Sequence, residues 1–212
     1  MSSRRLPVYL LLDTSGSMRG EPIQSVNVGL HAMLQALRQD PYALESVHLS
    51  VITFDLQARE LFPLTPIEQV QIPEITAPSS GPTFLGAALE LLVQCVQRDV
   101  ERSSPEKKGD WQPLLFVMTD GSPSDLQTYR DVIPLVKSLK FANIVACAAG
   151  PKAERDTLRE LTDTVVSLDT TDSATFAQFF KWVSASVSAG STSAGLATNV
   201  LPPPPEEVQI VV

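Results

Sequence analysis

Apolar residues in this chain form two alternating patterns, short unbroken runs and longer stretches with helical spacing. Residues 6–12 and 114–118 are unbroken apolar runs, which are typical of parallel strands buried on both faces of a sheet. Residues 22–38 instead place apolar side chains three and four positions apart, which predicts an amphipathic helix. The predicted strands cover residues 6–12, 47–54, 60–64, 114–118, 141–148 and 165–168. The predicted helices cover residues 22–38, 84–102, 154–161 and 173–187. A further helix is predicted to begin at Ser124 or Asp125, and Pro134 should kink it or begin a new turn.

This alternation of strands and helices predicts an α/β fold of three layers, in which a doubly wound, mostly parallel sheet lies between helices. Residues 60–64 are expected to pair beside residues 47–54 as one short antiparallel edge strand. Prolines are too frequent across residues 63–82 for a regular element, so this segment is expected to cross the surface.

The composition changes after Val187, first to Ser, Gly, Ala and Thr and then to consecutive prolines. Such a segment resembles a linker, and it divides the chain into a domain over residues 1–189 and a tail over residues 190–212. The last residues, 208–212, have strong strand propensity and could add to a sheet edge of a partner or of the same chain. A frayed tail is the simpler interpretation.

Composition places the chain among folded globular proteins. Its 212 residues, of which 43% are hydrophobic and 19% charged, are enough for one large domain. The net charge of −8 argues against non-specific binding to nucleic acid or to anionic membranes. No apolar run approaches the roughly 20 residues of a membrane helix, so the simplest expected location is cytoplasmic.

Polar side chains gather where predicted strands end and a predicted helix begins. Asp13, Ser15 and Ser17 follow the first strand, Thr83 precedes the helix at residue 84, and Asp120 follows the strand at residues 114–118. Ligand sites of open α/β sheets form at the carboxyl ends of the strands, where such loops converge. We therefore expect these five side chains to share one site.

All five side chains are oxygen donors, with no His or Cys among them. Oxygen donors suit a hard cation, Mg²⁺ first and Mn²⁺ or Ca²⁺ next, and argue against structural zinc. If Ser15, Ser17 and Thr83 bind the ion directly, while Asp13 and Asp120 act through water or hydrogen bonds, the ion keeps much of its charge. Such an ion would attract a carboxylate from another molecule.

This combination resembles the metal-ion-dependent adhesion site of von Willebrand factor type A domains, and the resemblance covers about residues 5–187. It implies that two serines and a threonine contact the ion and that the aspartates support it. It also implies that an Asp or Glu of a protein partner completes the coordination. Within that family, residues 4–9, 20–23, 108–111 and 179–184 are similar to TerY-type proteins of bacterial tellurium-resistance and stress-response clusters. That similarity implies a cytoplasmic protein that works with a phosphatase and a kinase.

Two alternatives remain open. A haloacid-dehalogenase-like phosphotransferase would use Asp13 as nucleophile and Asp120 with Asp125 as its Mg²⁺ loop. That chemistry needs an acid two residues after the nucleophile, where this chain has Ser15. Because glycine-rich phosphate loops and G-x-S-x-G elbows are also missing from the sequence, no enzymatic activity is predicted. The other alternative is a scaffold that binds through its tail, with an inactive metal site.

Overall fold

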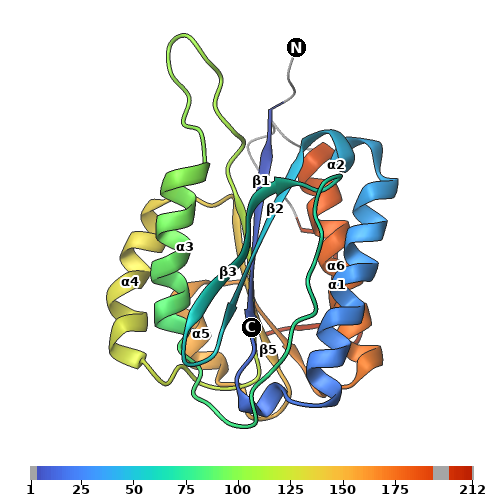
Figure 1. Ribbon diagram of the computed structural model, residues 1–212, viewed down its shortest axis with the longest axis vertical. Helices are drawn as coiled ribbons and strands as arrows, with labels where there is room; N and C mark the ends of the chain where they lie inside the picture. Colours follow the sequence, from blue (N-terminus) through green and yellow to red (C-terminus); the bar gives the residue numbers. More distant parts are fainter. Residues whose placement is uncertain (1–3, 193–200, 212) are drawn as a thin grey trace.

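A seven-stranded sheet forms the centre of the protein, as the computed structural model shows for residues 4–192 and 201–211. The strands lie in the order β3-β2-β1-β4-β5-β6-β7. Helices cover both faces of this sheet, which gives the three layers seen in Figure 1. The strands are β1 (Leu6–Asp13), β2 (Val47–Phe54), β3 (Ala58–Pro66), β4 (Leu114–Thr119), β5 (Asn143–Ala149), β6 (Val165–Leu168) and β7 (Gln209–Ile210).

Helices α1, α2 and α6 pack on one face of the sheet, and α3, α4 and α5 pack on the other (Figure 1). Their bounds are α1 (Glu21–Gln39), α2 (Pro41–Ser46), α3 (Leu85–Asp99), α4 (Leu126–Ser138), α5 (Arg155–Leu161) and α6 (Ser173–Thr192), with a short 3₁₀ helix, η1 (Gly16–Met18), after β1. Within residues 4–192 and 201–211, no helix is long and apolar enough to cross a membrane.

The unbroken apolar run of β1 is explained by the two cores that it joins. Leu10 and Leu12 pack with α1 and α6, whereas Tyr9 and Leu11 pack with α3 and α4. Because successive side chains of a strand point to opposite faces, a strand covered on both faces needs apolar residues at every position. The α/β architecture predicted from the sequence is therefore confirmed.

Both edges of the sheet are antiparallel, although the sequence predicted one such edge strand. Strand β3 pairs antiparallel with β2, and β7 pairs antiparallel with β6, while the inner pairs are parallel. The second edge strand forms because residues 201–211 return to the domain. Trp182 Nε1 donates a hydrogen bond to the Pro202 carbonyl at 2.9 Å. Val208 is buried in the core between the sheet and α6, so the terminal strand adds to an edge of its own chain.

Three further elements differ from the prediction. Residues 41–46 form the unpredicted helix α2, whose first turn is capped by the Asp40 side chain. Helix α4 continues through Pro134 as one helix. Helix α6 extends through residues 188–192, which were predicted to begin a linker, because Gly190 is buried close to Leu114 and Leu6. Residues 193–200 and 212 of the proposed tail lie outside the described residues.

Candidate metal centre

The five oxygen donors predicted from the sequence lie at the carboxyl end of the sheet. Asp13 is the last residue of β1, and Asp120 directly follows β4, which is the neighbour of β1 in the sheet. Ser15 and Ser17 belong to the turn after β1, and Thr83 lies just before α3. Parallel pairing of β1 with β4 therefore brings residues about a hundred positions apart into one cluster.

Asp13 is fully buried, and both of its carboxylate oxygens accept hydrogen bonds. Oδ1 accepts the backbone N–H of Ser15 at 2.7 Å, and Oδ2 accepts the hydroxyl of Thr119 at 2.6 Å. Burial raises the pKa of Asp13 to about 6, and the hydrogen bonds from Ser15 and Thr119 oppose that rise. Asp13 thus fixes the turn after β1 to the end of β4.

Two serine hydroxyls connect this turn to Asp120. The Oγ atoms of Ser15 and Ser17 lie 3.1 Å apart, and Ser17 Oγ donates to Asp120 Oδ1 at 2.8 Å. Burial raises the pKa of Asp120, while the bond from Ser17 and the charge of Lys152 lower it. Ser15 is buried and Ser17 is exposed, so solvent reaches the cluster at Ser17.

Thr83 completes the cluster from the loop before α3. A Cβ atom added to Gly121 would lie 3.6 Å from Thr83 Oγ1, which places this buried hydroxyl beside the residue that follows Asp120. The backbone of Thr83 also exchanges hydrogen bonds with Ser124, at 3.0 Å to the Ser124 hydroxyl and 2.8 Å from the Ser124 amide. The three loops therefore support one another.

Gly16 allows the first two loops to touch. A Cβ atom at this position would lie only 2.6 Å from Ser80 Cα, too close for any other residue without a backbone shift. The loop that carries Ser15 and Ser17 is therefore packed directly on the loop that leads to Thr83.

The donor set fits a hard divalent cation. The cluster offers three neutral hydroxyls and two carboxylates, and oxygen ligands are those that Mg²⁺, Mn²⁺ and Ca²⁺ prefer. No group of three or more His, Cys, Asp or Glu side chains suited to a metal occurs in the part of the chain that the structure describes. A metal centre at this cluster would combine its two carboxylates with hydroxyl ligands.

Asp125 does not join this cluster. Its carboxylate accepts the backbone N–H groups of Gly86 at 3.0 Å and Ala87 at 2.8 Å, and so caps the first turn of α3. Although Asp125 stands at the start of α4, it makes no side-chain cap there. This engagement removes Asp125 from the Mg²⁺ loop that the phosphotransferase alternative requires.

The structure adds two residues that the predicted site did not include. The first is Thr119, whose hydroxyl donates to Asp13 and accepts the Gly121 amide at 3.3 Å. The second is Asp55, a buried residue that follows β2 and accepts the Gln57 amide at 3.0 Å. Its carbonyl accepts the Phe84 amide at 3.0 Å, which ties the end of β2 to the loop that carries Thr83. Asp55 could have been found from the sequence, because it directly follows the predicted strand at residues 47–54.

Comparisons with known proteins identify the family of this fold. A family model described as "von Willebrand factor type A domain" matches residues 8–182. A search among curated proteins gave no match. A von Willebrand factor type A structure from Catenulispora acidiphila superposes with a TM-score of 0.65 at 16% identity, over 88% of this chain and 43% of that one.

Two other solved structures share the fold. Proximal thread matrix protein 1 of the mussel byssus, in a form described as having a zinc-occupied MIDAS motif, gives a TM-score of 0.64 at 16% identity, over 86% of this chain and 48% of that one. The ArnB paralog VWA2 from Sulfolobus acidocaldarius gives 0.59 at 15% identity, over 88% and 46%. The chain thus spans less than half the length of each of these three structures. Since the family model covers most of its length, the chain belongs to the von Willebrand factor type A domain family.

Proposed function

We propose that this chain is a metal-ion-dependent protein-binding module whose metal centre takes an Asp or Glu side chain from a partner protein. Ser15, Ser17 and Thr83 would bind the cation directly, with Asp13 and Asp120 in support. The observation that carries the proposal is that the carboxylates and the hydroxyls of the cluster make different contacts. Both carboxylates already accept hydrogen bonds from the protein, whereas three neutral hydroxyls gather beside them.

Neutral ligands decide what the site can do. A divalent cation held by hydroxyls keeps most of its positive charge, and when bound it would supply an electrostatic anchor for an external carboxylate. Ser17 is exposed while Asp13, Ser15 and Thr83 are buried, so a partner would approach from the side of Ser17. The position two residues after Asp13, where a phosphotransferase of the haloacid-dehalogenase type needs an acid, is occupied by Ser15, and we propose no enzymatic activity.

Mg²⁺ is the ion that the donor set favours, with Mn²⁺ and Ca²⁺ as the next choices. The zinc-occupied MIDAS motif of the mussel byssus protein supports a divalent ion at the corresponding place of this fold. Calorimetric titration of the purified chain with Mg²⁺, Mn²⁺, Ca²⁺ and Zn²⁺ would rank their affinities.

The finer part of the proposal concerns the partners. The similarity of residues 4–9, 20–23, 108–111 and 179–184 to TerY-type proteins supports a role in a cytoplasmic tellurium-resistance or stress-response assembly with a phosphatase and a kinase. Identification of a phosphatase or a kinase as the bound partner would support this assignment.

A metal-dependent capture experiment tests the proposal. The chain is immobilised and incubated with host-cell lysate in Mg²⁺ or in EDTA, beside a Ser15→Ala/Ser17→Ala variant. A Ser46→Ala/Ser184→Ala variant loses two hydroxyls that bond only to backbone carbonyls of their own helices, and is the matched control. Captured proteins are identified by mass spectrometry.

We expect a partner that is retained by the wild-type chain and the control in Mg²⁺ and released by EDTA or by the Ser15/Ser17 variant. Retention that ignores both EDTA and the serines would refute the metal bridge. It would instead favour the scaffold alternative, in which the tail binds the partner and the metal centre is inactive.

A further inference from the structure

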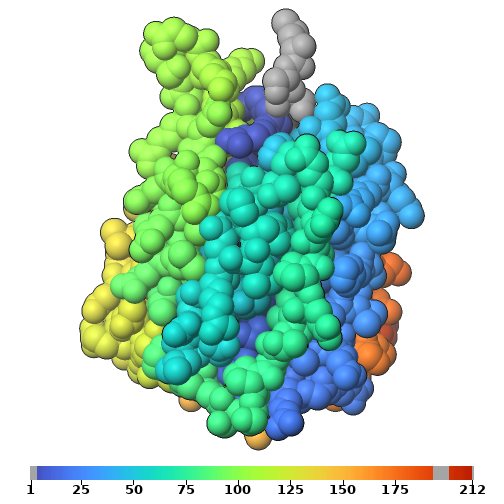
Figure 2. Space-filling view, viewed as in Figure 1, coloured from blue at the N-terminus to red at the C-terminus, as the bar shows by residue number. Residues whose placement is uncertain are grey.

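The segment between α3 and β4 is a structured arm that projects from the end of the molecule opposite the metal centre. We call residues 101–110 the arm; Figures 1 and 2 show that it extends beyond the body of the domain. Its two sides are joined by backbone hydrogen bonds, from Asp110 N to Glu101 O at 2.9 Å and from Ser104 N to Lys107 O at 2.9 Å. Residues 101–108 are all exposed, so the arm offers surface without taking part in the core.

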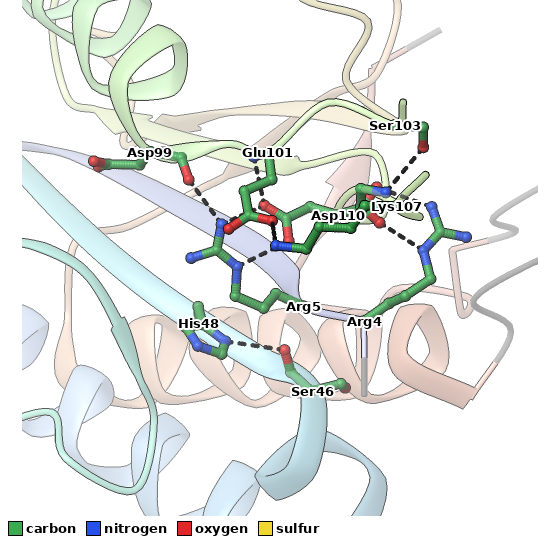
Figure 3. Close-up of polar contacts among 10 residues, drawn as sticks. Arg4, Arg5, Ser46, His48, Asp99, Glu101, Ser103, Lys107 and Asp110 are labelled. Atoms are coloured by element: carbon green, nitrogen blue, oxygen red, sulfur yellow. Dashed lines mark hydrogen bonds and ion pairs between the residues drawn. The ribbon is translucent and has the colours of Figure 1, made fainter. Parts of the chain in front are cut away.

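Two arginines at the start of β1 hold the base of the arm (Figure 3). Arg5 donates to both carboxylate oxygens of Asp110, at 2.8 and 2.6 Å, and the Asp110 side chain is only 5% exposed. Arg4 donates to the carbonyls of Gly109 and Asp110, and its guanidinium lies 3.6 Å from the centre of the Trp111 ring. A bidentate pair and a stacked guanidinium are geometrically specific contacts, so the arm has a defined orientation.

A cavity of about 450 Å³ lies between the arm and the carboxyl end of α4. Apolar surface comes from Val100, Trp111 and Leu139, and polar surface comes mainly from arm residues and from Lys140. Ligand cavities typically combine apolar walls with a few fixed polar groups, and this one has both.

Two acidic and two basic residues line this cavity, but only the acidic ones are held in ion pairs. Asp110 pairs with Arg5 and Glu101 pairs with Lys107, and neither of these two cations lines the cavity. Arg102 and Lys140 also line the cavity, and among the described residues neither has an ion-pair partner. On a chain with a net charge of −8, this leaves a locally cationic cavity with apolar walls.

We infer that this cavity is a second binding site, which takes an acidic extended segment of a protein partner independently of metal. Carboxylates of that segment would pair with Arg102 and Lys140, and an apolar side chain would lie against Trp111 and Leu139. The projecting arm favours a polypeptide ligand over a small anion, because the arm adds surface that an extended segment can contact along its length. Since β1 separates the two ends by roughly 23 Å at about 3.3 Å per residue, this site and the metal centre can be occupied together.

Peptide selection in EDTA tests this inference, because chelation silences the metal centre. A display library of random-sequence peptides is selected on the full chain, and enriched peptides are measured by fluorescence anisotropy. The test variant is Arg102→Gln/Lys140→Asn; asparagine suits position 140 because Lys140 has a positive φ of 58°. The matched control, Arg155→Gln/Lys181→Gln, removes two exposed cations outside the cavity.

We expect enriched peptides to be acidic, to bind the wild-type chain and the control equally, and to bind the test variant about tenfold more weakly. Failure to enrich acidic peptides, or equal binding by the test variant, would overturn the inference. Inorganic phosphate that competes as well as the peptide, mole for mole, would also overturn it in favour of a small-anion site. Because every binding measurement is made in EDTA, these outcomes are independent of the proposed metal function.

Discussion

Replacement of Gly16 by alanine should separate the two loops of the metal centre. The added Cβ would lie 2.6 Å from Ser80 Cα and 2.9 Å from the Ser80 carbonyl carbon, whereas ordinary contact begins at 3.4 Å. Both contacts are with backbone, so the loop that carries Ser15 and Ser17 must move by about 0.8 Å relative to the loop that carries Thr83. Gly16 does not have a positive φ, so an alanine there would cause crowding but no backbone strain.

A shift of this size should weaken divalent-cation binding by about 10- to 100-fold, the usual cost of misplacing groups that orient metal ligands. That loss corresponds to about 1.4–2.7 kcal/mol. Overpacking should also lower the free energy of unfolding by ~1–3 kcal/mol. Calorimetric titration with Mg²⁺ and Mn²⁺ measures the first effect, and urea unfolding in EDTA measures the second.

Gly81→Ala is the matched control, since its Cβ would meet only Pro78 Cγ at an ordinary 3.7 Å. We expect this variant to keep both its metal affinity and its stability. Equal metal affinities for the two variants would refute the reasoning that contact between these loops sets the geometry of the site.

Three other substitutions probe the rest of the molecule. Gly29→Ala would place a Cβ 2.2 Å from Cδ2 of Phe180 and should destabilise the contact of α1 with α6 by ~1–3 kcal/mol, measured by urea unfolding; an unchanged midpoint would contradict this packing. Burial lowers the pKa of His48 below its usual 6.5, so the unfolded chain takes up this proton first and the contribution of His48 to stability should fall as the pH drops below about 6.5. His48→Gln should flatten that slope in unfolding experiments across this range, and an identical slope would exclude the histidine as its source. Asp110→Asn removes the charge that Arg5 clamps and should speed amide exchange in residues 101–110 without changing metal affinity; unchanged exchange would show that the clamp does not order the arm.

The local pattern of the sequence was sufficient for most elements. Strand β1 was predicted within a residue of its observed end, because seven consecutive apolar residues are typical of a strand covered on both faces. Helix α2 was missed because six residues are too few to show a helical period. Its first turn also depends on a cap from the side chain of Asp40. Helix α6 was predicted too short because its last turn is rich in Ser and Gly, and burial of Gly190 against the sheet overrides their weak propensity.

The identity of the site residues followed from sequence position, but their mutual arrangement did not. Asp13, Ser15, Ser17, Thr83 and Asp120 could be named because each follows a strand or precedes a helix. The hydrogen bonds that occupy both aspartates, and the use of Asp125 to cap α3, depend on which strands are neighbours in the sheet. Spacing along the chain carries no information on these contacts.

The sequence by itself determined the α/β class, because that class follows from the local period, and it named five oxygen-bearing side chains at the strand ends and a helix start, because these depend on residue type. Only the tertiary structure decided that the last strand pairs with β6 of its own chain, and that Arg4 and Arg5 clamp an arm a hundred residues away. Such contacts form between segments distant in sequence, where the free energy gained by burying Val208 or pairing Asp110 exceeds the entropy lost in closing a long loop. That balance depends on how the whole chain packs, and no short stretch of residues encodes it.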